Sequence, residues 1–170
     1  DECMLERLDS VLLGPNKPIR DSLVFFGPND RCCSWFRSRL AGQPWNVRWL
    51  HSFDDVTSHI EACHTGQKSS AVVIFDVSSA AQATAGRQEQ LACMSTFVES
   101  FPTVPVIALF AEDPPPLVDV YRIGAVRVLV KPSTVSGHQS ERSDDRVEER
   151  FFQLLQAAVE GALRVGHLKQ

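Results

Sequence analysis

The stretch AVVIFD, residues 71–76, decides how this chain folds. Its first five residues are apolar and rich in β-branched side chains, and Asp76 follows them directly. A continuous apolar run of this kind is typical of a strand covered on both faces, as strands in parallel sheets are. We therefore expect residues 71–75 to form a central strand, with Asp76 at its carboxyl end.

Four further apolar runs, each followed by a helix-like stretch, surround this strand in the sequence. The runs cover residues 23–26, 47–50, 104–110 and 126–130, and helices are expected over 30–41, 54–63, 88–101, 113–123 and 147–168. Strands that alternate with helices predict a three-layer fold with a parallel sheet and right-handed crossovers. The predicted fold class is therefore α/β, a doubly wound (βα)5 domain.

The two ends of the chain extend beyond this alternating pattern. Residues 1–20 are predicted to form a helix and linker, because Leu5, Leu8 and Leu12 recur at helical spacing before Gly14 and Pro15. The domain itself should occupy 21–170, with a polar insertion at 133–146 and a long last helix at 147–168. That helix would span roughly 33 Å, which suggests a dimer contact or a connection to another domain.

The amino-acid composition argues against several classes of function. A formal net charge of −4 and a pI near 5.7 argue against a nucleic-acid-binding surface. No apolar run approaches the roughly 20 residues of a membrane span, and no signal peptide opens the chain. An odd number of cysteines without a CxxC pattern favours reduced thiols and a cytoplasmic protein; they are Cys3, Cys32, Cys33, Cys63 and Cys93.

Asp76 and Lys131 follow the third and fifth apolar runs. The carboxyl ends of parallel strands lie at one edge of the sheet, where open α/β folds place ligands and chemistry. We therefore expect a carboxylate and an ammonium from distant parts of the sequence to meet at that edge.

Three segments together resemble the receiver domain of response regulators: residues 72–76, 105–109 and 124–132. The similarity covers about 23–165. It implies a flavodoxin-like, receiver-like sandwich whose five parallel strands have the order 2-1-3-4-5. It also implies that Asp76 corresponds to the aspartate that accepts a phosphoryl group from a histidine kinase, beside Mg²⁺ held by an acidic pair after the first strand.

The chain departs from that family pattern at four positions. Phe25 and Phe26 take the places of the acidic pair, Phe110 that of a hydroxyl residue, and Val128 that of a switch aromatic. Phenyl rings cannot bind Mg²⁺, which requires oxygen ligands. The departures indicate a degenerate pseudo-receiver that is not an enzyme, has no cofactor and has lost or weakened Mg²⁺ binding.

Several alternatives stay open at this stage. Asp76 and Lys131 are either a structural ion pair shielded by Phe26 and Phe110 or a residual phosphoacceptor site. The rings of Phe25, Phe26 and Phe110 either fill the lost acidic pocket or line an apolar cleft for a small ligand or partner side chain. The function is accordingly regulation by protein contacts, unconventional phosphoacceptance, or ligand-dependent regulation on the same fold.

The resemblance also implies partners. They would be a histidine kinase or an output domain of the same chain, with no direct contact to nucleic acid or membrane. Receivers commonly dimerise through one face, which here would include Leu117, Val120, Tyr121, Arg122, Arg127, Val128 and the last helix. His59 and Cys63 lie one helical turn apart, but a zinc site usually needs four converging ligands, so we expect no metal there.

Overall fold

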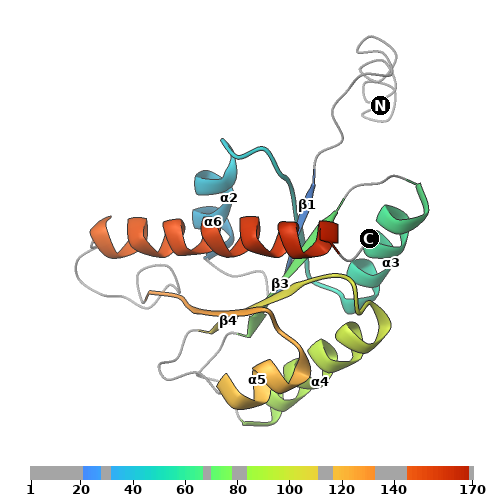
Figure 1. Cartoon of the computed structure of the whole chain (residues 1–170). Helices are drawn as coiled ribbons and strands as arrows, with labels where there is room; N and C mark the ends of the chain where they lie inside the picture. Colours follow the sequence, from blue (N-terminus) through green and yellow to red (C-terminus); the bar gives the residue numbers. More distant parts are fainter. Residues whose placement is uncertain are drawn as a thin grey trace.

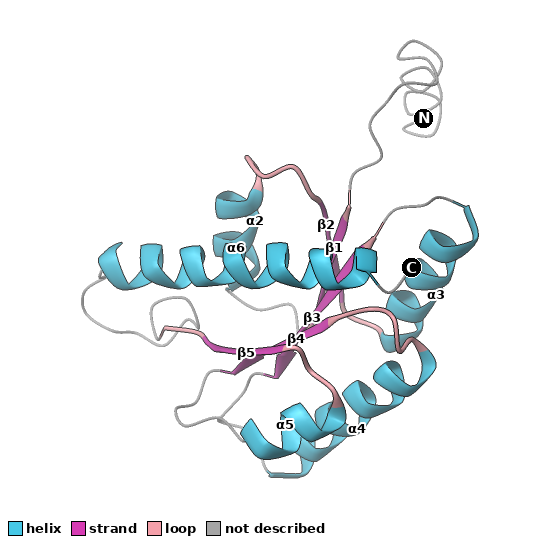
Figure 2. Cartoon of the chain, viewed as in Figure 1, coloured by secondary structure: helices cyan, strands magenta, loops and turns pink. Residues whose placement is uncertain are grey.

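The computed structural model describes residues 21–27, 32–66, 70–77, 84–110, 117–132 and 145–168. The elements in chain order are β1 (Ser22–Phe26), α2 (Cys32–Leu40), β2 (Asn46–Leu50), α3 (Phe53–Gly66), β3 (Ala71–Val77), α4 (Thr84–Ser100), β4 (Val106–Phe110), α5 (Leu117–Ile123), β5 (Arg127–Val130) and α6 (Asp145–Leu168). Strands and helices alternate throughout (Figure 2). The predicted helix and linker at 1–20, and most of the predicted insertion, lie outside the described residues.

The strands form one parallel sheet of order β2-β1-β3-β4-β5, which confirms the predicted fold class and strand order. Helices α2 and α6 cover one face of the sheet, and α3, α4 and α5 cover the other (Figure 1). The strand order reverses between β1 and β3, and at such a point the carboxyl ends of the strands leave room for a site. No helix in the described part of the chain is both long and apolar enough to cross a membrane.

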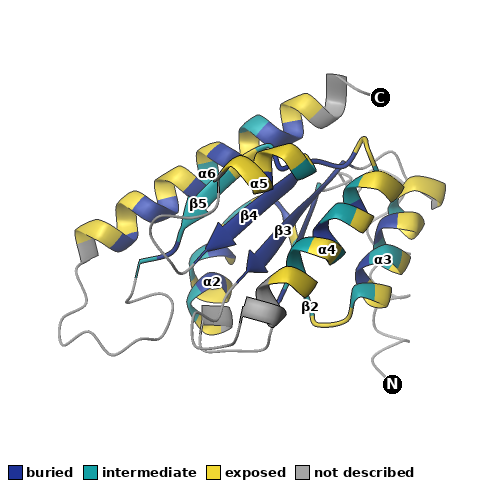
Figure 3. Ribbon diagram, turned by 90° about the horizontal axis from the view of Figure 1, so that it is seen from below, coloured by how far each residue is buried: buried dark blue, intermediate teal, exposed yellow. Residues whose placement is uncertain are grey.

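β3 lies at the centre of the sheet and is buried along its whole length (Figure 3). Its side chains alternate between two hydrophobic cores, because successive residues of a strand point to opposite faces. Val72 and Ile74 belong to the core under α2 and α6, whereas Val73 and Phe75 belong to the core under α3, α4 and α5. The continuous apolar run therefore serves two cores at once.

Some predicted boundaries differ from the structure. β3 continues to Val77, two residues beyond the predicted strand 71–75, and α4 begins at Thr84, four residues before the predicted start at 88. β4 begins at Val106, since Pro105 has no N–H to donate to the sheet. α6 begins at Asp145, so the predicted insertion overlaps its first turn by two residues.

Gly124 ends α5, as the sequence predicts. Its φ of 123° lies in the left-handed region that favours glycine. A Cβ at this position would also lie 2.9 Å from Cγ1 of Val98 on α4. Glycine thus allows the chain to turn sharply into β5, the edge strand that leads to Lys131.

Candidate functional site

The structure brings Asp76 and Lys131 together at the carboxyl edge of the sheet. The Nζ atom of Lys131 donates a hydrogen bond of 2.7 Å to Oδ1 of Asp76, and both side chains are completely buried, with 0% exposure. The backbone N–H of Lys131 donates to the carbonyl oxygen of Phe110, 2.7 Å away, which continues the pairing of β4 and β5 by one residue. The ion pair therefore links the central strand to the edge strand across β4.

Complete burial determines what this pair can do chemically. A charge removed from water is tolerated only when an opposite charge or good hydrogen bonds compensate it. Each member of the pair supplies that compensation for the other. A phosphoryl donor or a cation that approached Asp76 would have to open the sheet edge and compete with the Lys131 ammonium.

Gly27, the residue directly after β1, approaches Asp76 closely, which the sequence did not predict. Phe26 pairs with Phe75 in the sheet, so the next residue, Gly27, lies beside Asp76. A Cβ on Gly27 would be 2.7 Å from Cβ of Asp76, closer than such atoms approach each other. Any side chain here, a carboxylate included, would displace Asp76.

His51 and Leu50 hold Gly27 in this position. The Gly27 N–H donates to the carbonyl oxygen of Leu50 at 3.3 Å, and Nδ1 of His51 lies 2.9 Å from the carbonyl oxygen of Gly27. The end of β1 is therefore tied to the end of β2. A glycine directly after an apolar strand is the one signal in the sequence that could have indicated this close approach.

The three phenylalanines of the predicted cleft lie in two separate cores. Phe25 is fully buried under α2 and α6, where it stacks on Trp49 with 4.7 Å between ring centroids and 8° between the planes. Phe26 packs against the other face, edge-on to Phe75, and Phe110 is buried on that same face. The alternative of one cleft lined by all three rings is wrong, because the neighbours Phe25 and Phe26 point to opposite faces of the sheet.

The described residues around Asp76 do not fit a Mg²⁺ ion. Mg²⁺ requires near-octahedral oxygen ligands, whereas Phe25, Phe26 and Gly27 have no side-chain oxygen and the Asp76 carboxylate is buried against an ammonium. Asp30, the first residue of the predicted helix 30–41 and the next carboxylate after β1, lies outside the described residues. Within the described ranges, no three His, Cys, Asp or Glu side chains are grouped in a way that could hold a metal ion.

The predicted partner face is only partly available. Val120 is fully buried in the core under α5, so its assignment to the surface is wrong: α5 turns this residue toward the sheet. Tyr121, Arg122 and Arg127 are exposed and Val128 is half-buried, while the side chain of Leu117 lies outside the description. The large hydrophobic side chains exposed among the described residues all lie on the two helices beside β5; they are Val118, Tyr121, Val147, Leu154 and Val165.

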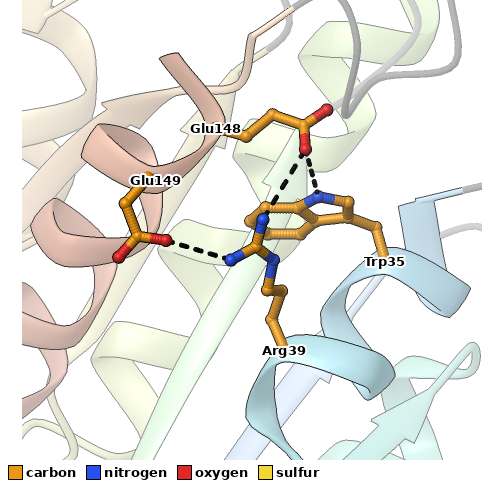
Figure 4. Close-up of polar contacts among 4 residues, drawn as sticks. All are labelled: Trp35, Arg39, Glu148 and Glu149. Atoms are coloured by element: carbon orange, nitrogen blue, oxygen red, sulfur yellow. Dashed lines mark hydrogen bonds and ion pairs between the residues drawn. The ribbon is translucent and has the colours of Figure 1, made fainter. Parts of the chain in front are cut away.

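A cluster of four side chains joins α2 to α6, and the sequence analysis missed it (Figure 4). Nε1 of Trp35 donates to Glu148 at 3.2 Å, and Arg39 donates to Glu149 at 3.0 Å. The Arg39 guanidinium also lies over the ring of Trp35, 5.5 Å from its centroid. The residues on α2 and their partners on α6 are more than 100 positions apart in the sequence, so no local pattern could reveal this cluster. The cluster attaches the amino-terminal half of α6 to α2.

His59 and Cys63 contact each other on α3, with 3.7 Å between Nε2 and Sγ. Burial, together with the positive charge of Arg48, lowers the pKa of His59 below 6.5. A lowered pKa keeps the imidazole neutral and is consistent with a packing role.

This pKa shift predicts a pH dependence of stability. The folded state binds the His59 proton less readily than the unfolded state, so the stability that neutral His59 contributes above pH 6.5 is lost as the pH falls below that value. We expect His59→Gln to flatten the decline of the unfolding free energy just below pH 6.5, measured by urea denaturation. An identical slope in both proteins would contradict the prediction.

Comparison with known proteins identifies the fold of this chain. No family model matches the sequence, and no curated protein is significantly similar to it. Among solved structures, a response regulator receiver domain protein from Clostridium thermocellum superimposes with a TM-score of 0.59 at 14% identity, covering 88% of this chain and 99% of its own. The signal receiver domain of an HD domain-containing protein from Pseudomonas fluorescens Pf-5 gives 0.58 at 14% identity, covering 88% and 98%.

A third structure, NtrX from Brucella abortus in complex with ADP, gives a TM-score of 0.57 at 17% identity. The match covers 89% of this chain but only 28% of NtrX. Identities this low establish similarity of fold and nothing finer. The chain therefore has the fold of a response-regulator receiver domain.

Proposed function

We propose that this chain is a regulatory module of signal transduction, a pseudo-receiver that acts through protein contacts and without magnesium-dependent phosphorylation of Asp76. The observation that carries the proposal is the complete burial of the Asp76 carboxylate against Lys131 at 2.7 Å. In this role the domain is not an enzyme. Its partners would be a histidine kinase or an output domain of the same chain, in the cytoplasm.

The physical argument concerns charge. Phosphoryl transfer is catalysed by positioning and by neutralising the negative charge of the transferred group, usually with metal ions. Even one missing donor to a developing oxyanion costs roughly 3–4 kcal/mol of transition-state stabilisation. Here the described end of β1 offers Phe25, Phe26 and Gly27, none of which has a side-chain oxygen. The loss of a metal-binding carboxylate pair should cost more than that of one donor.

Treatment with a small phosphodonor tests the proposal. We expect acetyl phosphate or beryllofluoride with Mg²⁺ to leave the intact mass and the ¹H–¹⁵N spectrum unchanged, because Asp76 is inaccessible. A conventional receiver treated in the same buffer is the positive control. A mass increase that disappears in Asp76→Asn would overturn the proposal and favour the phosphoacceptor alternative.

Homodimerisation is a second element of this proposed function. The surface formed by α5, β5 and α6 contains the exposed hydrophobic residues Tyr121 and Leu154, with exposed fractions of 48% and 51%. Asp119 and Arg122, both exposed, lie on the same helix. A two-fold axis brings the same patch of two copies together, so a carboxylate of one copy can meet a guanidinium of the other around an apolar centre.

We expect the chain to sediment as a dimer at high concentration and Leu154→Glu to shift it to monomer, because the substitution places charge in the apolar part of the contact. Gln153→Glu, an adjacent exposed position, adds the same charge and should leave the dimer intact. Sedimentation velocity measures both variants. A wild-type chain that remains monomeric at high concentration would refute dimerisation without affecting the conclusion about Asp76.

A further inference from the structure

An aromatic groove lies between α2 and the edge strand β2, away from the Asp76 site. Its volume is about 350 Å³, within the size range of small binding sites. Phe36 and Leu40 of α2 form one wall, and Trp45, Val47 and Trp49 form the other. Arg37, Ala41 and Gln43 complete the lining, which contains no acidic side chain.

The position of the groove follows from how the helices share this face of the sheet. α6 contacts β3, β4 and β5, so the nine-residue α2 covers the β1 and β2 end. Val47 and Trp49 remain only half-buried. Nε1 of Trp49 is buried and has no hydrogen-bond partner in the described part of the protein. The groove thus leaves apolar side chains of β2 partly open to water, and a suitable apolar occupant would cover them.

We propose that residues 4–13 of this same chain pack into the groove as an amphipathic helix. Leu5, Leu8 and Leu12 provide an apolar stripe at helical spacing. The point at which this segment is attached, Asp21, also lies near the groove. The backbone N–H of Asn46, which follows Trp45, donates to the carbonyl oxygen of Asp21 at 2.8 Å. The chain before Asp21 therefore joins the described fold next to the end of the groove.

The lengths of the segment and its linker match the length of the groove. The seven residues 14–20 that connect the segment to Asp21 can span up to about 23 Å when extended. A helix of ten residues is about 15 Å long. The row of side chains from Trp45 to Trp49 covers four strand steps, or about 13 Å. One short helix can therefore lie along the whole row.

The charges of the segment and of the groove are also complementary. Residues 1–13 contain four carboxylates, in Asp1, Glu2, Glu6 and Asp9, against the single guanidinium of Arg7. The charged residue that lines the groove is Arg37, a cation. A carboxylate on the segment can pair with the exposed guanidinium of Arg37. Docking would also shield the edge strand β2, whose open side is otherwise prone to pair with other strands.

Indole signals of the full-length chain provide the test, since two of its three tryptophans line the groove. We expect Leu8→Asp to shift the Nε1–H resonances of Trp45 and Trp49 and to increase their quenching by acrylamide. The Trp35 resonance should not move. Ser10→Asp is the matched control, because it adds the same charge on the opposite side of the predicted helix and should change nothing. Trp45→Phe and Trp49→Phe assign the signals.

Two further measurements test whether the groove is occupied by the segment of the same chain or by a segment of a second copy. A synthetic peptide of residues 1–13, added to the Leu8→Asp protein, should restore the wild-type indole signals. The wild-type signals should also stay the same over a wide dilution series, as intramolecular packing requires. Equal responses to Leu8→Asp and Ser10→Asp would overturn the proposal. Signals that change on dilution would overturn it as well, by assigning the groove to a segment of a second copy.

Discussion

Replacing Lys131 by Met is expected to lower the free energy of unfolding by about 3–5 kcal/mol, the usual cost of breaking a buried ion pair by removing one partner. The substitution keeps most of the apolar stem but leaves the Asp76 carboxylate without its ammonium at a site with 0% exposure. Urea denaturation followed by tryptophan fluorescence measures the loss. It should be among the largest effects of any single substitution in this domain.

Two control variants separate the charge from the packing. Asp76→Asn combined with Lys131→Met should recover much of the lost stability, because no charge then remains buried without a partner. Arg127→Met removes an exposed cation from β5 and should change stability by no more than about 0.5 kcal/mol. If the double variant were at least as unstable as Lys131→Met alone, the uncompensated carboxylate would not be the cause.

Phe25→Ala is expected to cost a further large amount, about 3–5 kcal/mol, as for other buried phenylalanines. The ring has 0% exposure. It stacks on Trp49 and lies 4.9 Å from Phe36, measured between ring centroids. Its removal would leave a cavity under α2 that the sheet cannot close, because interiors of proteins are close-packed and relax only in part. Chemical denaturation gives the free energy, and the emission of Trp49 reports the lost contact.

Phe25→Leu keeps most of the apolar volume and should lose clearly less stability than Phe25→Ala. Tyr121→Ala removes an aromatic ring that is 48% exposed and should have little effect on the monomer. A loss below about 1 kcal/mol for Phe25→Ala, well under the usual range, would show that the ring does not support the core.

Both predictions concern the carboxyl edge of the sheet, where the resemblance to receivers also places an acidic pair. In this chain Phe25 supports the core under α2, and Gly27 approaches Asp76 so closely that a Cβ would lie 2.7 Å from Cβ of Asp76. An acidic pair could not be rebuilt here by changing side chains alone. A carboxylate at position 25 would be buried among aromatic rings, and one at position 27 would displace Asp76. This packing supports the proposed role that does not depend on magnesium.

Much of the fold could be predicted from the sequence, because the signals for it are local. The apolar runs and the helical spacing between them depend on neighbouring residues only. They located the five strands and identified 71–76 as the central one, and the resemblance to receivers added the strand order that the structure confirms. The same reasoning expected Asp76 and Lys131 at one sheet edge, because all strands of a parallel sheet end on the same side.

Tertiary structure alone decided the details of the site. Strand alternation sends Phe25 and Phe26 to different cores, and only the register of β1 against β3 reveals that Gly27 lies beside Asp76. Likewise, Glu149 on α6, a partner of Arg39, lies 110 positions away from it in the sequence. A sequence pattern shows which residues are apolar and at what period they recur. Which side chains then share a volume depends on how separate elements pack, and that information is not local.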